Sequence, residues 1–279
     1  MAQFHSLALQ SETALWATRG SVVPRLGYWV VRTPSDPAYY YGNLLLLPEA
    51  PRAETIPLWQ ARFAEEFAGQ VQHSTFWWDS GELNPAALRE FGSRGFTVET
   101  SEVLRRDPRL PWVAQSLGPD IEIREISAGE TALLADLADR LSDRHDDVYL
   151  TFLQRRARWQ GQLIQRGLAH FFACMTDHRV VASLGIFVHH DLARYQDVQT
   201  DAAYRRRGLA TALVGVAGQH RAARGTTMLT IHTEPNSDAA RLYRQLGFTL
   251  VETTTSACRY PRSFGPGQPD PSARPSGTT

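Results

Sequence analysis

The sequence contains no lysine, so all 29 of its basic side chains are arginine. This absence excludes Schiff-base chemistry on a lysine and a lysine that clamps phosphate. Cysteine is scarce as well, since only Cys174 and Cys258 occur, which is too few for a disulfide framework or a structural zinc site. His189, His190 and His232 have no third ligand at a metal-binding spacing. We therefore expect no metal in this protein.

Net charge is also missing, because 29 acidic residues cancel the 29 basic ones. A basic surface is what binding to nucleic acid or to an anionic membrane requires, so we expect neither as a partner. No apolar run reaches the roughly 18 residues that a membrane helix needs. Residues 1–16 lack the basic start and apolar run of a signal peptide. The expectation is a soluble, cytoplasmic protein.

The sequence does contain enough hydrophobic residues to form the cores of two domains. The chain has 279 residues, of which 43% are hydrophobic. Residues 105–120 contain the dipeptides Asp-Pro, Leu-Pro and Gly-Pro, which are typical of a linker. From Pro261 onward, proline, glycine and serine dominate without apolar periodicity. The sequence therefore predicts domains at 1–118 and 119–262 and a disordered tail at 263–279.

Alternating and helical patterns after the linker predict a mixed α/β fold. Strands are expected at 121–126, 171–175, 179–188, 195–200, 228–233 and 248–257, and helices at 127–141, 149–166, 209–223 and 238–246. Ser127 and Glu130 stand at the spacing of a capping box, which favours a helix start there.

The first half repeats the end of the second half. A shift of 152 residues gives six identities in the 14 positions from Asn84 to Thr97. Upstream, a strand at 39–47, a helix at 58–67 and a strand at 73–78 follow the same order as in the second half. We therefore predict two copies of one α/β fold.

The most informative motif is the segment 204–210, Tyr-Arg-Arg-Arg-Gly-Leu-Ala, between a predicted strand and a predicted helix. The unpaired N–H groups and positive dipole end of a helix start attract anions. Gly208 and Ala210 are small, so a pyrophosphate could approach the main chain closely. The same pattern on its own is equally typical of a solvated surface turn.

A second motif follows one strand later, with the spacing Asn-x-x-Ala-x-x-Leu-Tyr-x-x-x-Gly-Phe from Asn236 to Phe248. With both motifs in this order, the chain from Ile121 to Tyr260 resembles the Gcn5-related N-acetyltransferase (GNAT) family. The acyl-CoA loop of that family reads Gln/Arg-x-x-Gly-x-Gly/Ala. The resemblance implies an α/β fold with a mixed sheet, and together with the 152-residue repeat it implies tandem acyl-CoA N-acyltransferase-like domains. The second would be intact and the first degenerate.

The resemblance also implies the binding residues for acetyl-CoA, the expected co-substrate. The residues that would hold the CoA pyrophosphate are Arg205, Arg206, Arg207, Gly208, Leu209, Ala210 and Thr211. Those along the pantetheine arm would be Val198, Gln199 and Thr200, and Asn236 would contact the cofactor from the other side. The sequence departs from the family at Thr200 and Ala202, where a hydrophobic residue and a proline are common.

Two residues are candidates for catalysis. By the resemblance, Tyr243 would return a proton to the departing thiolate, and a phenol with a pKa near 10 can serve as a general acid at neutral pH. The alternative for Tyr243 is a buried packing residue. No glutamate stands where the family has its base, and the nearest carboxylate is Asp197. Asp197 could relay a proton from an amine through water, or could form a structural hydrogen bond to a nearby turn.

The expected activity is transfer of an acetyl group from acetyl-CoA to an amine by direct attack in a ternary complex. The acceptor would be a small molecule or a peptide. An acidic run, Asp136, Asp139, Asp143, Asp146 and Asp147, would attract a cationic amine or would form a solvated helix face. The alternative function is a non-catalytic acyl-CoA-binding regulatory module. The sequence indicates neither the acceptor nor the oligomeric state.

Overall fold

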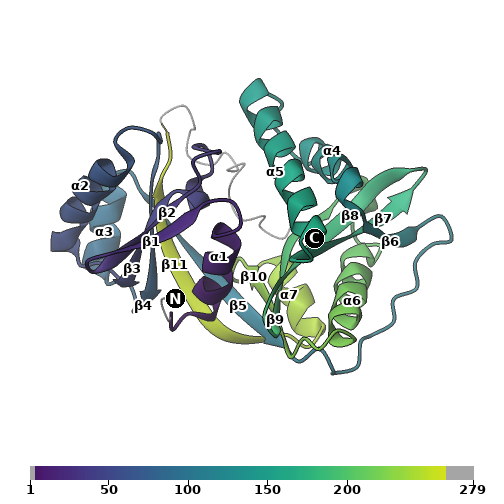
Figure 1. Cartoon of the computed structure of the whole chain (residues 1–279). Helices are drawn as coiled ribbons and strands as arrows, with labels where there is room; N and C mark the ends of the chain where they lie inside the picture. The colour runs from purple at the N-terminus through teal and green to yellow at the C-terminus, as the bar shows by residue number, and fades with distance from the viewer. Residues whose placement is uncertain (1–3, 262–279) are drawn as a thin grey trace. The chain divides into compact units, whose positions relative to one another are not determined.

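The computed structural model describes residues 4–261, drawn as a ribbon in Figure 1. These residues form two compact units: unit 1 comprises residues 4–101 and the segment from Glu252, and unit 2 comprises residues 102–251. Within residues 4–261, no helix combines the length and apolar character needed to cross a membrane. The predicted tail at 263–279 lies outside the described residues.

Unit 1 is a mixed sheet with helices. Its elements are α1 (Leu7–Trp16), β1 (Ser21–Arg25), β2 (Tyr28–Arg32), β3 (Leu44–Glu49), α2 (Ile56–Phe67), β4 (Ser74–Ser80), α3 (Pro85–Ser93) and most of β11 (Thr249–Arg259). Strands β1, β2 and β3 are antiparallel in succession, β3 is parallel to β4, and β4 is antiparallel to β11. The core of unit 1 is aromatic, with Phe76, Phe91 and Phe96 buried against one another.

Unit 2 is built in the same way with two additions. Its elements are the second half of β5 (Thr97–Arg106), β6 (Glu122–Ile126), α4 (Ala132–Arg140), α5 (Asp147–Gln165), β7 (Ala169–Thr176), β8 (Arg179–His189), β9 (Leu192–Thr200), α6 (Leu209–Ala222), β10 (Met228–Thr233) and α7 (Asp238–Gln245). The strand order is β5-β10-β9-β8-β7-β6, and only the β9–β10 pair is parallel. Strand β6 and helix α4 have no counterpart in unit 1.

The 152-residue repeat is visible in the backbone. In each copy, three antiparallel strands lead to a helix, α2 or α6, and then to a fourth strand that is parallel to the third. The turns after α3 and α7 also match, because Gly95 (φ 76°) and Gly247 (φ 85°) are both left-handed. Phe96 and Phe248 each donate their amide N–H to the carbonyl five residues earlier, at 3.0 Å. Such a helix end favours glycine, which explains the glycine in both copies.

The last strand of each copy completes the other copy's sheet. Strand β5 follows α3 but pairs with β10, with Leu104 opposite Ile231, and β11 follows α7 but pairs with β4, with Ala257 opposite Phe76. The compact units therefore divide within β5 and β11, whereas the predicted boundary at residue 118 falls inside unit 2. Periodicity along the chain predicts a strand but does not reveal its partner.

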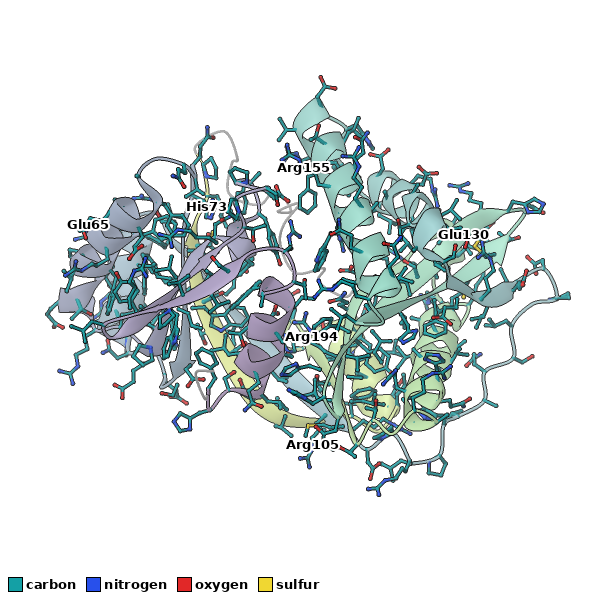
Figure 2. The ribbon with its side chains drawn as sticks, in the orientation of Figure 1. Glu65, His73, Arg105, Glu130, Arg155 and Arg194 are labelled. Atoms are coloured by element: carbon teal, nitrogen blue, oxygen red, sulfur yellow. The ribbon has the colours of Figure 1, made fainter. Side chains whose placement is uncertain are left out.

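Two predicted elements start differently in the structure. The strand predicted at 39–47 begins only at Leu44, because Tyr40–Gly42 form a 3₁₀ turn. The helix predicted at 127–141 opens with a 3₁₀ turn at Ala128–Glu130 before α4. The carboxylate of Glu130, labelled in Figure 2, accepts hydrogen bonds from the N–H and the Oγ of Ser127 at 3.0 and 2.6 Å. The capping box is thus confirmed.

Candidate functional site

The start of α6 is the structural centre of the candidate site. Gly208 is the N-cap residue, with a φ of 80°, and it has no side chain to accept from the N–H groups of the first turn. Arg206, two residues earlier, is also left-handed, with a φ of 63°. The first-turn N–H groups and the helix dipole therefore stay available to an anion, as the sequence predicts.

A cavity of about 510 Å³ opens at this helix start. Its lining consists of Thr200, Tyr204, Arg205, Arg206, Gly208, Leu209, Ala210, Thr211, Asp238 and Leu242. The Oγ1 of Thr200 is buried and has no hydrogen-bond partner among the described residues. Thr200 thus lines the cavity with other atoms than this hydroxyl. Of the predicted binding residues, Thr200 and six of the seven in the loop reach this cavity.

Four predicted binding residues lie elsewhere. Val198 is buried in the core of unit 2, and Gln199 lines a separate small cavity beside α5. The guanidinium of Arg207 stacks over the Tyr204 ring at 4.8 Å. Asn236 is exposed and left-handed, and Ser237 rather than Asn236 caps α7.

Asp238 is a lining residue that the sequence analysis missed. Its carboxylate is negative at a site proposed for an anion, but it forms an ion pair with Arg241 on the same helix. Pairing at a spacing of three residues on a helix reduces the repulsion that Asp238 would exert. The spacing Asp-x-x-Arg in the second motif was the available signal.

Tyr243 lies in the core of unit 2 and does not line the 510 Å³ cavity. It is 1% exposed and packs edge to face with Phe248, with ring centroids 6.2 Å apart. Burial raises the pKa of its phenol well above the ordinary value, so the hydroxyl stays protonated at neutral pH. These surroundings fit the packing alternative, and they also keep a proton on the group that the acid hypothesis needs.

Asp197 lies where β9 departs from regular geometry. Its φ is 56°, and the β8–β9 register shifts between Ser183 and Gly185. The carboxylate forms an ion pair with Arg156 and accepts a hydrogen bond from Gln160 Nε2 at 3.1 Å. Both partners are on α5, so Asp197 connects that helix to the bulge. The role is structural, as one of the two alternatives from the sequence was, but the partners lie on a helix and not in a nearby turn.

The segment between β5 and β6 borders the loop. A Cβ placed on Gly208 would come within 2.6 Å of the Gln115 side chain, so Gln115 lies against this glycine. Trp112 packs against α6 at Gly215 and Gly218, and the Arg106 guanidinium stacks over the indole at 3.5 Å. Nothing in the spacing of residues 105–120 predicts this contact, because it joins positions about a hundred residues apart.

Much of the acidic run is engaged locally. Asp146 is the N-cap of α5, where it accepts from the Tyr149 N–H at 3.0 Å, and it pairs with Arg144 at 2.7 Å. Asp139 pairs with His145 at 2.9 Å. Of the two alternatives for the acidic run, attraction of a cationic amine or a solvated helix face with its cap, these contacts fit the second.

Comparison with known proteins agrees with this geometry. Residues 167–250, which include the loop and the start of β11, match the family model of the acetyltransferase (GNAT) domain. This part of the chain is similar to the GNAT family. The match confirms the predicted family and the predicted enzyme class, an N-acetyltransferase. No curated protein matches the sequence.

Solved structures match almost the whole chain. A conserved protein of unknown function from Staphylococcus epidermidis ATCC 12228 is 12% identical with a TM-score of 0.69, over 86% of this chain and 94% of its own. A GCN5-related N-acetyltransferase from Kribbella flavida is 14% identical with a TM-score of 0.64, over 91% and 96%. One from Sphaerobacter thermophilus is 16% identical with a TM-score of 0.54, over 84% and 82%. These likenesses confirm the predicted tandem α/β fold.

Proposed function

We propose that unit 2 transfers the acetyl group of acetyl-CoA to an amine acceptor while both are bound in one ternary complex. The observation that carries this proposal is the cavity at the start of α6, where a left-handed Gly208 leaves the first-turn N–H groups uncapped. The family match of residues 167–250 supports the chemistry.

The loop would bind the anionic end of acetyl-CoA. The N–H groups of Leu209, Ala210 and Thr211 supply hydrogen bonds, and Arg205 and Arg206 supply positive charge at the cavity. Thr200 lines the same cavity. Val198 and Gln199 precede Thr200 on β9, the strand along which the pantetheine arm would run. Asn236 and Arg207 would act at the rim.

The reaction needs little more than orientation and proton transfer. The amine nitrogen forms a bond to the thioester carbonyl carbon, the carbon–sulfur bond breaks, and the thiolate takes a proton. Tyr243 is the proposed donor of that proton. The proton lost by the amine would pass through water, with Asp197 as the carboxylate nearest to the loop on β9.

The acceptor is proposed to be a small-molecule or peptide amine. The exposed members of the acidic run with no described side-chain contact are Asp136, Asp143 and Asp147, and their charge would favour a cationic amine. Asp197 is paired with Arg156, so its own charge is largely offset.

A second function is favoured by one specific observation. Neither proposed catalytic group projects freely into the cavity, since Tyr243 is buried in the core and Asp197 is ion-paired. This arrangement would suit a non-catalytic module that binds acyl-CoA and regulates a partner.

Thiol release separates the two functions. The full chain would be incubated with acetyl-CoA and a library of amines, and free CoA would be measured with a thiol reagent. Calorimetry would measure acetyl-CoA affinity in parallel. An amine that accelerates CoA release supports the transferase. Tight binding without release by any amine supports the module, and absence of binding contradicts both.

A further inference from the structure

A second cluster of ligating side chains lies at the other end of α6. Glu125 of β6, His170 of β7 and His220 of α6 each contribute one ligand atom, and these atoms lie within 4.8 Å of one another. The loop at Gly208 begins α6, whereas His220 is in its last turn. The cluster therefore does not share the acyl-CoA cavity.

The three side chains converge closely. Oε1 of Glu125 and Nδ1 of His170 are 2.6 Å apart, and the two imidazole rings meet edge to face with centroids 4.5 Å apart. Nδ1 of His220 is buried and has no hydrogen-bond partner among the described residues. A buried ring nitrogen without a partner is costly in a purely structural role, which points to a missing ligand.

The spacing of histidines along the sequence led us to expect no metal, but the fold brings together residues that are far apart in the chain. We propose that Glu125, His170 and His220 bind a zinc ion. Two imidazole nitrogens and one carboxylate oxygen are a donor set that zinc accepts, and a water molecule would complete four-coordination. The side chain of Glu125 is 45% exposed, so the cluster borders on solvent.

The donor set of the cluster suits a cation. Binding would displace the proton between Glu125 and His170, as metal binding to histidine generally does. The negative charge of Glu125 then offsets part of the charge of the ion.

The positive charge of Arg221 would repel the ion and indicates on which side of His170 the ion would lie. Nη1 of Arg221 lies 3.5 Å from Nε2 of His170, and the Arg221 Nε donates to Thr226 Oγ1 at 3.2 Å. The repulsion is therefore strongest on the Nε2 side of His170. The opposite side, Nδ1, faces Glu125 and is the side that we assign to the zinc ion.

Such an ion would fasten an edge strand. Strand β6 ends the described sheet and pairs only with β7, so it depends on few contacts. A ligand that binds only the folded state raises the midpoint of unfolding. Zinc should therefore raise the melting temperature of the full chain by joining β6, β7 and α6.

The experiment is a zinc titration of the metal-free full chain, followed by calorimetry and by thermal unfolding with and without zinc. We expect one ion per chain and a higher Tm. The variants Glu125→Gln, His170→Gln and His220→Gln should each weaken binding at least tenfold and remove the Tm shift, while unfolding like the parent in chelator.

Two histidine variants outside the cluster serve as matched controls. His178 and His190 are left-handed, with φ values of 62° and 55°, and asparagine tolerates that conformation. His178→Asn and His190→Asn should bind zinc like the parent. Zinc binding that survives in the three cluster variants, or that disappears in His190→Asn, would overturn the proposal. If His220→Gln does not fold, the exposed Glu125→Gln decides between these outcomes.

Discussion

The conformation of Gly208 offers a direct test of the loop. Its φ of 80° is tolerated by asparagine and aspartate better than by most residues, so the isosteric pair Gly208→Asn and Gly208→Asp can be compared. Each side chain would push Gln115 aside equally. Only aspartate adds negative charge where the pyrophosphate should lie, and like charges about 4 Å apart repel strongly near a protein surface.

We therefore expect Gly208→Asp to bind acetyl-CoA at least tenfold more weakly than Gly208→Asn, measured by calorimetry at one ionic strength. Raising the salt concentration should narrow the difference, because screening weakens the repulsion. Equal affinities for the two variants would place the phosphates away from α6.

Tyr243 can be tested as an acid with Tyr195 as its control. Tyr243→Phe should keep acetyl-CoA affinity and lower turnover by roughly 10²-fold, the usual scale of general acid catalysis. Tyr195 is also buried in unit 2, but its hydroxyl donates to the Val214 carbonyl at 2.8 Å. Tyr195→Phe should lower stability and keep turnover. If the Tyr243→Phe variant turns over as fast as the parent, Tyr243 is a packing residue and not the acid.

The residues of the site differ in how well the sequence alone predicts their place in it. Gly208 and its neighbours follow one another along the chain, so their spacing alone predicted that they share a helix start. Gln115 contacts the same loop, but it belongs to a segment that the sequence pattern predicts only as a linker. The partners of Asp197 are on α5, about forty positions earlier, and no periodicity connects them. Contacts of this kind are set by tertiary packing.

At the scale of elements, Arg106 holds the segment that follows β5 against the rest of unit 2. It is 4% exposed and donates to the carbonyls of Leu246, Asp107, Leu110 and Pro111 at 2.7 to 3.0 Å. Arg106→Leu would leave several carbonyls without a donor, and we expect a loss of about 2–5 kcal/mol in the free energy of unfolding. Urea denaturation would measure it.

Arg109→Leu is the matched control for Arg106. Among residues 4–261, Arg109 pairs only with Asp107, in its own turn, and its side chain is 79% exposed. Surface pairs contribute little, so its variant should unfold like the parent. Equal destabilisation by both variants would show that the segment is held by something other than the Arg106 contacts.

The elements of unit 2 after β5 were largely predictable, because each depends on local signals, whereas the sequence analysis made no prediction for α1, β1, β2 or β5. The helices α5, α6 and α7 and the strands of unit 2 lie close to their predicted ranges, and the capping box at Ser127 has the expected contacts. The exchange of β5 and β11 was not predictable. The pattern along a strand does not identify the strand with which it pairs, and only the folded sheet shows that β5 pairs with β10 and β11 with β4.

At the scale of the whole molecule, the two copies should differ in ligand binding. The 152-residue alignment places Ala53, Ile56, Leu58 and Phe91 opposite Arg205, Gly208, Ala210 and Tyr243. Ile56 begins α2 and is fully buried, so a branched side chain stands where unit 2 has its glycine. We expect calorimetry to give one acetyl-CoA per chain, lost in Gly208→Asp. A second cofactor beside Ile56 would contradict a degenerate first copy.

The strand exchange predicts how the chain responds to division. A fragment of residues 1–118 lacks β11 and leaves β4 unpaired on one edge, and a fragment of residues 119–279 lacks β5 and leaves β10 unpaired. Exposed edges with apolar faces associate with other chains. We expect each fragment alone to aggregate, and the two produced together to form a soluble complex that binds acetyl-CoA, measured by size-exclusion chromatography and calorimetry. A monomeric, cooperatively folded 119–279 fragment would show that β5 is dispensable to unit 2.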